Sequence, residues 1–401
     1  MKILHKNRWI IVGSLLALMS CNDSQSQNKN EGYTVKGTIK GVPDGTVKLV
    51  SYNEDDRTSK TIDSTEFKNG VFEIKGKIVS PQMVTVIIEP GNWSFQAFLE
   101  NAPITLTADT TGSAHYDYTM YGETKGAIIK KFTETGSQNF DDYTKFQNDP
   151  GQKKYEPVFA DLNKKITTTK DIDEQYHYRD QMDSVRKLLN AWREEQIKSY
   201  IGKNPGSVAG AYMLREQYNW DSDMPFTEMQ QMVGSLQGEA KQSTYYNSLQ
   251  DILAKRKAVM PGSMAPDFTL LKRDSSKFTL SSTKGRYMMI DFWASWFHPC
   301  RNAIPHWKDV YAKYHDKGFD IVSVSDDNVW KNWFKAMDQE KMPWTQVCDE
   351  FPLKNMPARV GSLYMTSYIP FYVLLDKEGK ILLYTGDENK IDEKLKEVFG
   401  S

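Results

Sequence analysis

The last third of the chain alternates short apolar runs with helical patterns, and this order restricts the fold more than any other feature. Apolar strands are expected at Tyr287–Trp293 and Phe319–Ser325, and each precedes an amphipathic stretch. A hairpin is expected next, around the turn Asp376–Gly379, and a helix over Ile391–Phe399 closes the chain. The order strand, helix, strand, helix, hairpin, helix predicts an α/β domain over residues 262–401.

The preceding residues divide into a strand-rich part and a helical part. Residues 33–112 carry short alternating apolar runs separated by turn dipeptides such as Asp44-Gly45, a pattern typical of an antiparallel β-sandwich. Residues 120–258 carry amphipathic helical patterns. One apolar helical face consists of Val185, Leu188, Leu189, Trp192, Ile197, Tyr200 and Ile201. The prediction is a multidomain protein with an N-terminal β-sandwich, a helical middle region and a C-terminal α/β domain.

The N-terminus has the pattern of a secretory signal peptide over residues 1–20. Basic residues precede an apolar run over Trp9–Met19, which is too short to span a bilayer as a helix. The sequence Leu18-Met19-Ser20-Cys21 resembles a bacterial lipobox, which implies that Cys21 is lipidated and begins the mature protein. Residues 21–32 are polar and predict a flexible tether. An ordinary signal peptide followed by an incidental cysteine is the alternative.

This pattern predicts a lipid-anchored protein of the bacterial cell envelope that faces the periplasm. Asn22 follows the lipobox cysteine, which by resemblance favours the outer membrane. The chain has three cysteines, so only Cys300 and Cys348 remain as thiols if Cys21 is acylated. Two thiols do not form a disulfide-rich scaffold.

The run Asp291–Arg301 carries the chemistry of the C-terminal domain. Its sequence, DFWASWFHPCR, resembles the strand-to-helix corner of TlpA-like (AhpC/TSA-related) thiol:disulfide oxidoreductases, which have the motif W-C-x-P-C there. Ala265-Pro266-Asp267-Phe268, Ile369-Pro370 and the turn at 376–379 match the same family in order. The resemblance implies a thioredoxin-like fold. The β-rich region in turn resembles an uncharacterised domain that often precedes such domains in lipoproteins.

The position of the attacking cysteine is occupied by Phe297, and only the resolving position, Cys300, retains a thiol. A dithiol exchanger needs a thiolate at the helix N-terminus and a second thiol one turn later. Because phenylalanine cannot form a thiolate, the sequence leaves enzymatic activity open. The resemblance implies that Asp291 lies near Cys300, where burial and a negative charge would both raise the pKa of the thiol.

Two uses of the remaining thiols stay open. Cys300 is either a buried relic or a residual catalytic thiol, assisted by Asp291 and acting with Cys348 or with an external thiol. A bridge between Cys300 and Cys348 requires Cα atoms within about 7 Å, which the sequence does not determine.

The residues with which this family binds a partner segment are present in the sequence. The resemblance implies that Pro370 is a cis-proline and that the backbone of Ile369 pairs with an extended substrate segment. Trp296 and Phe297 are expected to form an apolar lip with Pro370, a feature that often marks a protein contact. The alternative is that Phe297 packs into the site vacated by the cysteine.

Several classes of function are not supported by the sequence. The net charge of −1 lacks the basic excess typical of nucleic-acid binding. His298, His306 and His315 do not have the i, i+4 spacing of helical metal ligands, and no cofactor or metal is predicted. The preferred function is a thioredoxin-like lipoprotein that binds a protein or peptide in the envelope without dithiol exchange. A residual redox enzyme and a purely structural envelope protein are the alternatives.

Overall fold

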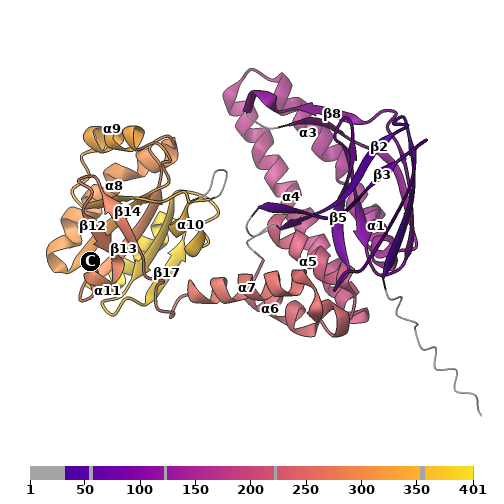
Figure 1. Ribbon diagram of the computed structural model, residues 1–401. Helices are drawn as coiled ribbons and strands as arrows, with labels where there is room; N and C mark the ends of the chain where they lie inside the picture. Colours follow the sequence, from indigo (N-terminus) through magenta and orange to yellow (C-terminus); the bar gives the residue numbers. More distant parts are fainter. Residues whose placement is uncertain (1–31, 54–56, 122–123, 221–223, 353–356, 401) are drawn as a thin grey trace, which may run out of the picture.

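The computed structural model describes residues 32–53, 57–121, 124–220, 224–352 and 357–400. Figure 1 shows a strand-rich N-terminal part, helices beside it and an α/β part that contains the C-terminal third of the chain. The predicted multidomain fold class is therefore confirmed. The predicted signal peptide and Cys21 lie outside the described residues.

In the described ranges the N-terminal part consists of two sheets that enclose a hydrophobic core. The strand orders are β10-β7-β1-β4 and β3-β2-β5-β6-β9-β8. Alternate residues of β1, such as Val35 and Ile39, point into this core while their neighbours face solvent. The strands are β1 (Tyr33–Lys40), β2 (Gly45–Asn53), β3 (Thr58–Phe67), β4 (Val71–Gly76), β5 (Gln82–Glu89), β6 (Trp93–Leu99), β7 (Pro103–Asp109), β8 (Ala114–Asp117), β9 (Lys125–Ile128) and β10 (Lys131–Thr135).

Three features of this β-part differ from the sequence prediction. The pairs β1·β7 and β6·β9 are parallel, so the sandwich is not purely antiparallel. Strands β8–β10 continue the sheets to Thr135, beyond the predicted boundary at residue 112. Strand β3 has no alternating apolar pattern because it is mostly exposed, and pairing with β2 defines it instead.

The helical part packs directly against the sheet that contains β5 and β6. Met83 and Phe98 of this sheet form a buried cluster with Val208 and Tyr212 of α5 (Val208–Trp220). The backbone N–H of Met83 donates to the hydroxyl of Tyr245 at 2.7 Å. The other helices are η1 (Thr119–Tyr121), α1 (Gln138–Gln147), α2 (Pro150–Lys153), α3 (Glu156–Thr168), α4 (Ile172–Lys203), α6 (Phe226–Ser235), η2 (Gly238–Gln242) and α7 (Thr244–Ala258).

The predicted apolar face of the long helix α4 is only partly buried. Ile197 and Ile201 lie in the helical core, but Leu188 is exposed. The buried residues of α4 begin at Asn190, so its N-terminal half extends past the core that its C-terminal half completes. Among the described helices, none is long and apolar enough to cross a membrane.

The C-terminal part is a thioredoxin-like α/β domain with the strand order β12-β11-β15-β14-β13-β16-β17. Strands β13, β14 and β15 run parallel, and β16 runs antiparallel to β13. The elements are β11 (Thr269–Lys272), β12 (Lys277–Thr279), η3 (Leu280–Thr283), β13 (Tyr287–Trp293), α8 (His298–Tyr314), η4 (His315–Lys317), β14 (Phe319–Ser325), α9 (Trp330–Glu340), β15 (Thr345–Cys348), α10 (Arg359–Leu363), β16 (Phe371–Leu375), β17 (Ile381–Thr385) and α11 (Glu388–Phe399).

Helices cover both faces of this sheet, so its inner strand β13 is almost entirely buried. Met288, Ile290 and Phe292 share a core with Val360 and Tyr364 on one face. On the other face, Met289 packs with residues of α8 and α11. Because side chains alternate along a strand, Asp291 lies on the same face as α8, the helix that carries Cys300.

Candidate functional site

The corner between β13 and α8 places the single thiol of the motif under the helix N-terminus. Phe297 is the N-cap residue of α8 and contributes no side-chain hydrogen bond to the first turn. Pro299 occupies the first turn, where its missing N–H costs nothing. Cys300 follows one residue later and is only 3% exposed.

Phe297 packs against the cluster that contains the buried thiol. Its half-buried ring lies against a cluster that contains Cys300, Trp293 and Trp333. Trp296 stays 65% exposed and meets the Phe297 ring edge-on, with ring centroids 5.8 Å apart. Phe297 therefore packs against the buried cluster, while Trp296 beside it faces solvent.

The environment of Cys300 disfavours its thiolate. Burial raises the pKa of the Cys300 thiol to about 12, and the nearby negative charge of Asp291 adds to this shift. Hydrogen bonds to the backbone act in the opposite direction but do not compensate. A thiol with such a pKa is a poor nucleophile at neutral pH.

Asp291 is itself buried in the middle of the sheet. The hydroxyl of Ser323 donates to its carboxylate at 2.7 Å, and the indole N–H of Trp344 donates to Ser323 at 2.8 Å. Burial raises the pKa of Asp291 to about 7, against the opposing effect of the Ser323 hydrogen bond. Asp291 therefore has the pKa of a group that exchanges protons near neutrality.

Cys348 joins the same buried cluster from the end of β15. Its thiol donates to the backbone carbonyl of Asp327 at 3.2 Å. Burial raises its pKa to about 12, and the charges of Asp327 and Asp349 contribute further. Both Cys300 and Cys348 are free thiols in the structure. The tertiary fold thus brings into one cluster two cysteines that lie far apart in sequence.

The Ile369–Pro370 peptide bond is cis and lies at the beginning of β16. Ile369 packs against the cluster that holds Cys300 and also against the core on the opposite face. Together with Trp296 it lines a cavity of about 470 Å³. The predicted binding residues Trp296 and Ile369 thus share one hollow, while Phe297 packs on the neighbouring buried cluster.

Three acidic residues at this edge of the sheet were not among the residues predicted from the sequence. Asp326 and Asp327 directly follow β14, and Asp349 directly follows β15. Asp327 accepts hydrogen bonds from the backbone N–H of Ser295 at 2.9 Å and from its hydroxyl at 2.6 Å. The rule that carboxyl ends of parallel strands meet at one edge could have indicated them.

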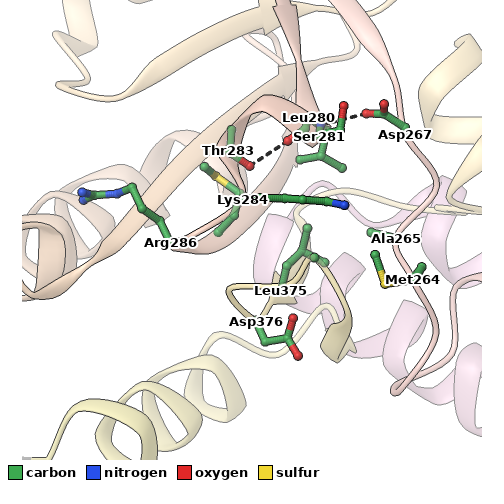
Figure 2. A pocket seen from close by; sticks show the side chains of 12 residues that line it. Met264, Ala265, Asp267, Leu280, Ser281, Thr283, Lys284, Arg286, Leu375 and Asp376 are labelled. Carbon is green, nitrogen blue, oxygen red and sulfur yellow. Dashed lines mark hydrogen bonds between the residues drawn. The ribbon is translucent and has the colours of Figure 1, made fainter.

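A second hollow lies at the opposite end of the same sheet (Figure 2). It measures about 230 Å³ and is lined by residues at the start of β13 and the end of β16, including Met288 and Leu375. Figure 2 shows Lys284 extended across it, whereas Arg286 points away. This hollow is remote from both cysteines. Among the described residues, no cluster of histidine, cysteine or acidic side chains has the arrangement of a metal site.

The fold and the corner together define a class of protein: a thioredoxin-like domain with a buried Cys300, an adjacent acidic Asp291 and a cis-proline groove. It has no second thiol at the N-terminus of α8, because Phe297 stands there.

Comparisons with known proteins identify the family. Residues 260–398 match the family Redoxin, and residues 33–143 match a domain of unknown function, DUF4369. The thiol-disulfide oxidoreductase ResA of Bacillus cereus is 27% identical over 152 residues, which cover 37% of this chain and 79% of that protein. The corresponding ResA of Oceanobacillus iheyensis is 31% identical over 129 residues, 30% of this chain and 62% of that protein.

Among solved structures, the thioredoxin domain of a thiol-disulfide oxidoreductase from Bacteroides vulgatus is 29% identical. That match covers 35% of this chain and 99% of the other, with a TM-score of 0.32. From the Redoxin match and the ResA relatives, the C-terminal domain belongs to the TlpA-like, thioredoxin-fold thiol-disulfide oxidoreductase family.

Proposed function

We propose that this chain is an envelope lipoprotein whose thioredoxin-like domain binds an extended protein segment without dithiol exchange. The observation that carries the proposal is that Phe297 occupies the N-cap of α8 while the thiol of Cys300 is buried and has a raised pKa. A thiol exchanger needs an accessible thiolate to attack and a second thiol to resolve the mixed disulfide. The corner of this domain supplies only the thiol at the resolving position, Cys300, which is buried, and no thiol at the attacking position.

The groove beside the cis-proline supports partner binding. Trp296 is exposed at its rim. The family resemblance implies that the backbone of Ile369, which lines the same cavity, pairs with an extended partner segment. Addition of an extended segment to such a backbone supplies main-chain hydrogen bonds, while hollows for side chains supply specificity. An exposed tryptophan at the rim is the kind of residue that dominates binding energy in protein interfaces.

The envelope location is proposed from the N-terminal sequence. Cys21 would carry the lipid, and residues 22–32 would separate the folded domains from the membrane. The β-part and the helical part share a core around Met83 and Tyr212, so they would act as a single support for the thioredoxin-like domain.

Photocrosslinking in the producing cell tests the proposal. A photoreactive amino acid at Trp296 is expected to give discrete protein adducts, and Cys300→Ser in the same chain is expected to leave them unchanged. Trp220 is the matched control, since it is 67% exposed but lies at the end of α5. Adducts that appear equally at both positions, or that vanish with Cys300→Ser, would contradict binding without exchange.

A residual redox enzyme is the second candidate, favoured by the presence of Cys300 and Cys348 in one buried cluster. In that reaction two thiols become a bridge, and the two electrons and two protons reduce a partner disulfide to two thiols. Pre-reduced protein would then reduce a model disulfide, and Cys300→Ser or Cys348→Ser would abolish the activity. Activity that depends on both cysteines would replace the binding proposal with this one.

A further inference from the structure

The cavity beside the cis-proline combines apolar walls with carboxyl groups. Phe292 and Val324 line it from the sheet, and Trp296, Tyr368 and Ile369 line it from the loops at the carboxyl edge. Phe292 belongs to the core on the face opposite to the one that holds Cys300. The cavity is therefore distinct from the buried thiol cluster, and Ile369 packs against both the thiol cluster and the core on the cavity side.

Two acidic side chains, Asp326 and Asp349, also line this cavity. Asp349 is held in place by the backbone N–H groups of Val360 and Gly361, at 2.9 Å and 2.8 Å. In the described part of the chain, no hydrogen bond or ion pair engages the carboxylate of Asp326. Burial and repulsion by the charges of Asp349 and Asp327 raise the pKa of Asp326 to about 6, so most Asp326 side chains are still negatively charged at neutral pH.

Cations near the cavity come from two directions. Burial raises the pKa of Asp349 and the charge of Arg359 opposes this rise, but the Arg359 guanidinium already forms an ion pair with Glu350 at 2.6 Å. Arg57, directly before β3 of the N-terminal part, lines the same cavity from the other side. A guanidinium of this chain thus already lies at a hollow that bears two carboxyl groups.

We propose that this cavity receives an arginine or lysine side chain of the extended partner segment, with Asp326 and Asp349 as its counter-charges and Arg57 as a competing cation. This assignment rests on the proposed function, because the segment must first dock beside the cis-proline. The carboxyl groups repel an acidic side chain and leave a neutral one without a matching charge. Trp296 and Tyr368 add aromatic rings to the lining, and aromatic rings attract cations.

Peptide binding to the full chain tests this assignment. Fluorescein-labelled seven-residue peptides of serine and valine, differing only in a central arginine, glutamine or glutamate, are titrated at low salt and followed by fluorescence anisotropy. The arginine peptide is expected to bind at least ten-fold more tightly than the glutamine peptide. Asp326→Asn is expected to remove this difference, whereas Asp316→Asn, at the other end of the sheet, should preserve it.

Arg57→Gln provides an independent measurement from the other domain. Loss of the competing cation is expected to raise the affinity for the arginine peptide at least two-fold and to leave the glutamine peptide unchanged. Equal affinities for the arginine and glutamine peptides would overturn the assignment and leave the proposed partner binding intact. Failure of all three peptides to bind would overturn both.

Discussion

The carboxyl group of Asp291 lies near enough to the thiol of Cys300 for its charge to add to the effect of burial on the thiol pKa, which reaches about 12. In active dithiol exchangers the helix N-terminus lowers the pKa of an exposed thiol. Here the remaining thiol lies in the first turn of the helix, where it is buried and beside an anion.

The first prediction concerns thiol reactivity. With a pKa near 12, about one Cys300 thiol in ten thousand is ionised at pH 8. Ellman's reagent should therefore react with the folded protein at least a hundred-fold more slowly than with the unfolded chain. Asp291→Asn should accelerate the reaction several-fold by removing the negative charge, while Asp316→Asn should not. Rapid labelling of Cys300 in the folded protein would contradict the buried, protonated thiol.

The second prediction concerns Phe297. Phe297→Cys creates a Cys-x-x-Cys pair with Cys300 at the N-terminus of α8, and it should raise reduction of a model disulfide at least ten-fold above the unsubstituted protein. The double variant Phe297→Cys, Cys300→Ser should lose this activity, because the mixed disulfide can no longer be resolved. Phe297→Cys should also lower the free energy of unfolding. Truncation of a fully buried Phe to Ala costs roughly 3–5 kcal/mol, and the loss here should be smaller because Phe297 is half-buried.

Two results would show that position 297 does not by itself separate this domain from its active relatives. Equal activity in the unsubstituted protein would mean that Cys300 already suffices. Absence of activity in a folded variant would mean that the surrounding site has changed as well.

The third prediction concerns pH and stability. Glu134 of β10 is buried and accepts the backbone N–H of Phe98 at 3.0 Å, and burial raises its pKa to about 8. The folded state then binds a proton that the unfolded state releases between pH 4.5 and 8, so stability should fall as pH rises through this range. Glu134→Gln keeps an acceptor for Phe98 and should make the melting temperature less dependent on pH.

Thermal unfolding of both proteins at pH 5 and pH 8 checks this effect. Asp291 and Asp326 also have raised pKa values, so the difference between the two proteins isolates Glu134. The same pH dependence in both would show that Glu134 is not the responsible group.

The fourth prediction concerns membrane attachment. Cys21→Ser removes the sulfur that would be acylated, so the protein should leave the membrane fraction or accumulate with its signal peptide uncleaved. Fractionation and intact mass measure both outcomes. An unsubstituted protein found unacylated and outside the membrane fraction in its native cell would contradict the lipobox prediction.

The main strands and helices of the C-terminal domain could be predicted from the order of residues, and the place of Phe297 in the motif followed from the resemblance to a known family. Apolar runs such as Phe319–Ser325 are buried on both faces, and burial of that kind leaves a local signal in the chain. Strand β3 has no apolar pattern of this kind, because it is mostly exposed and is defined by its pairing with β2.

Which distant residues meet could be learned only from the folded chain. Cys300 and Cys348 enter one cluster because β15 lies beside β14 in the sheet, and Asp326 and Asp349 line one cavity because parallel strands end at the same edge. Arg57 reaches that cavity from a different domain. Such contacts depend on strand order and domain packing, which the local periodicity of a sequence does not encode, because it records only which side of each element is buried.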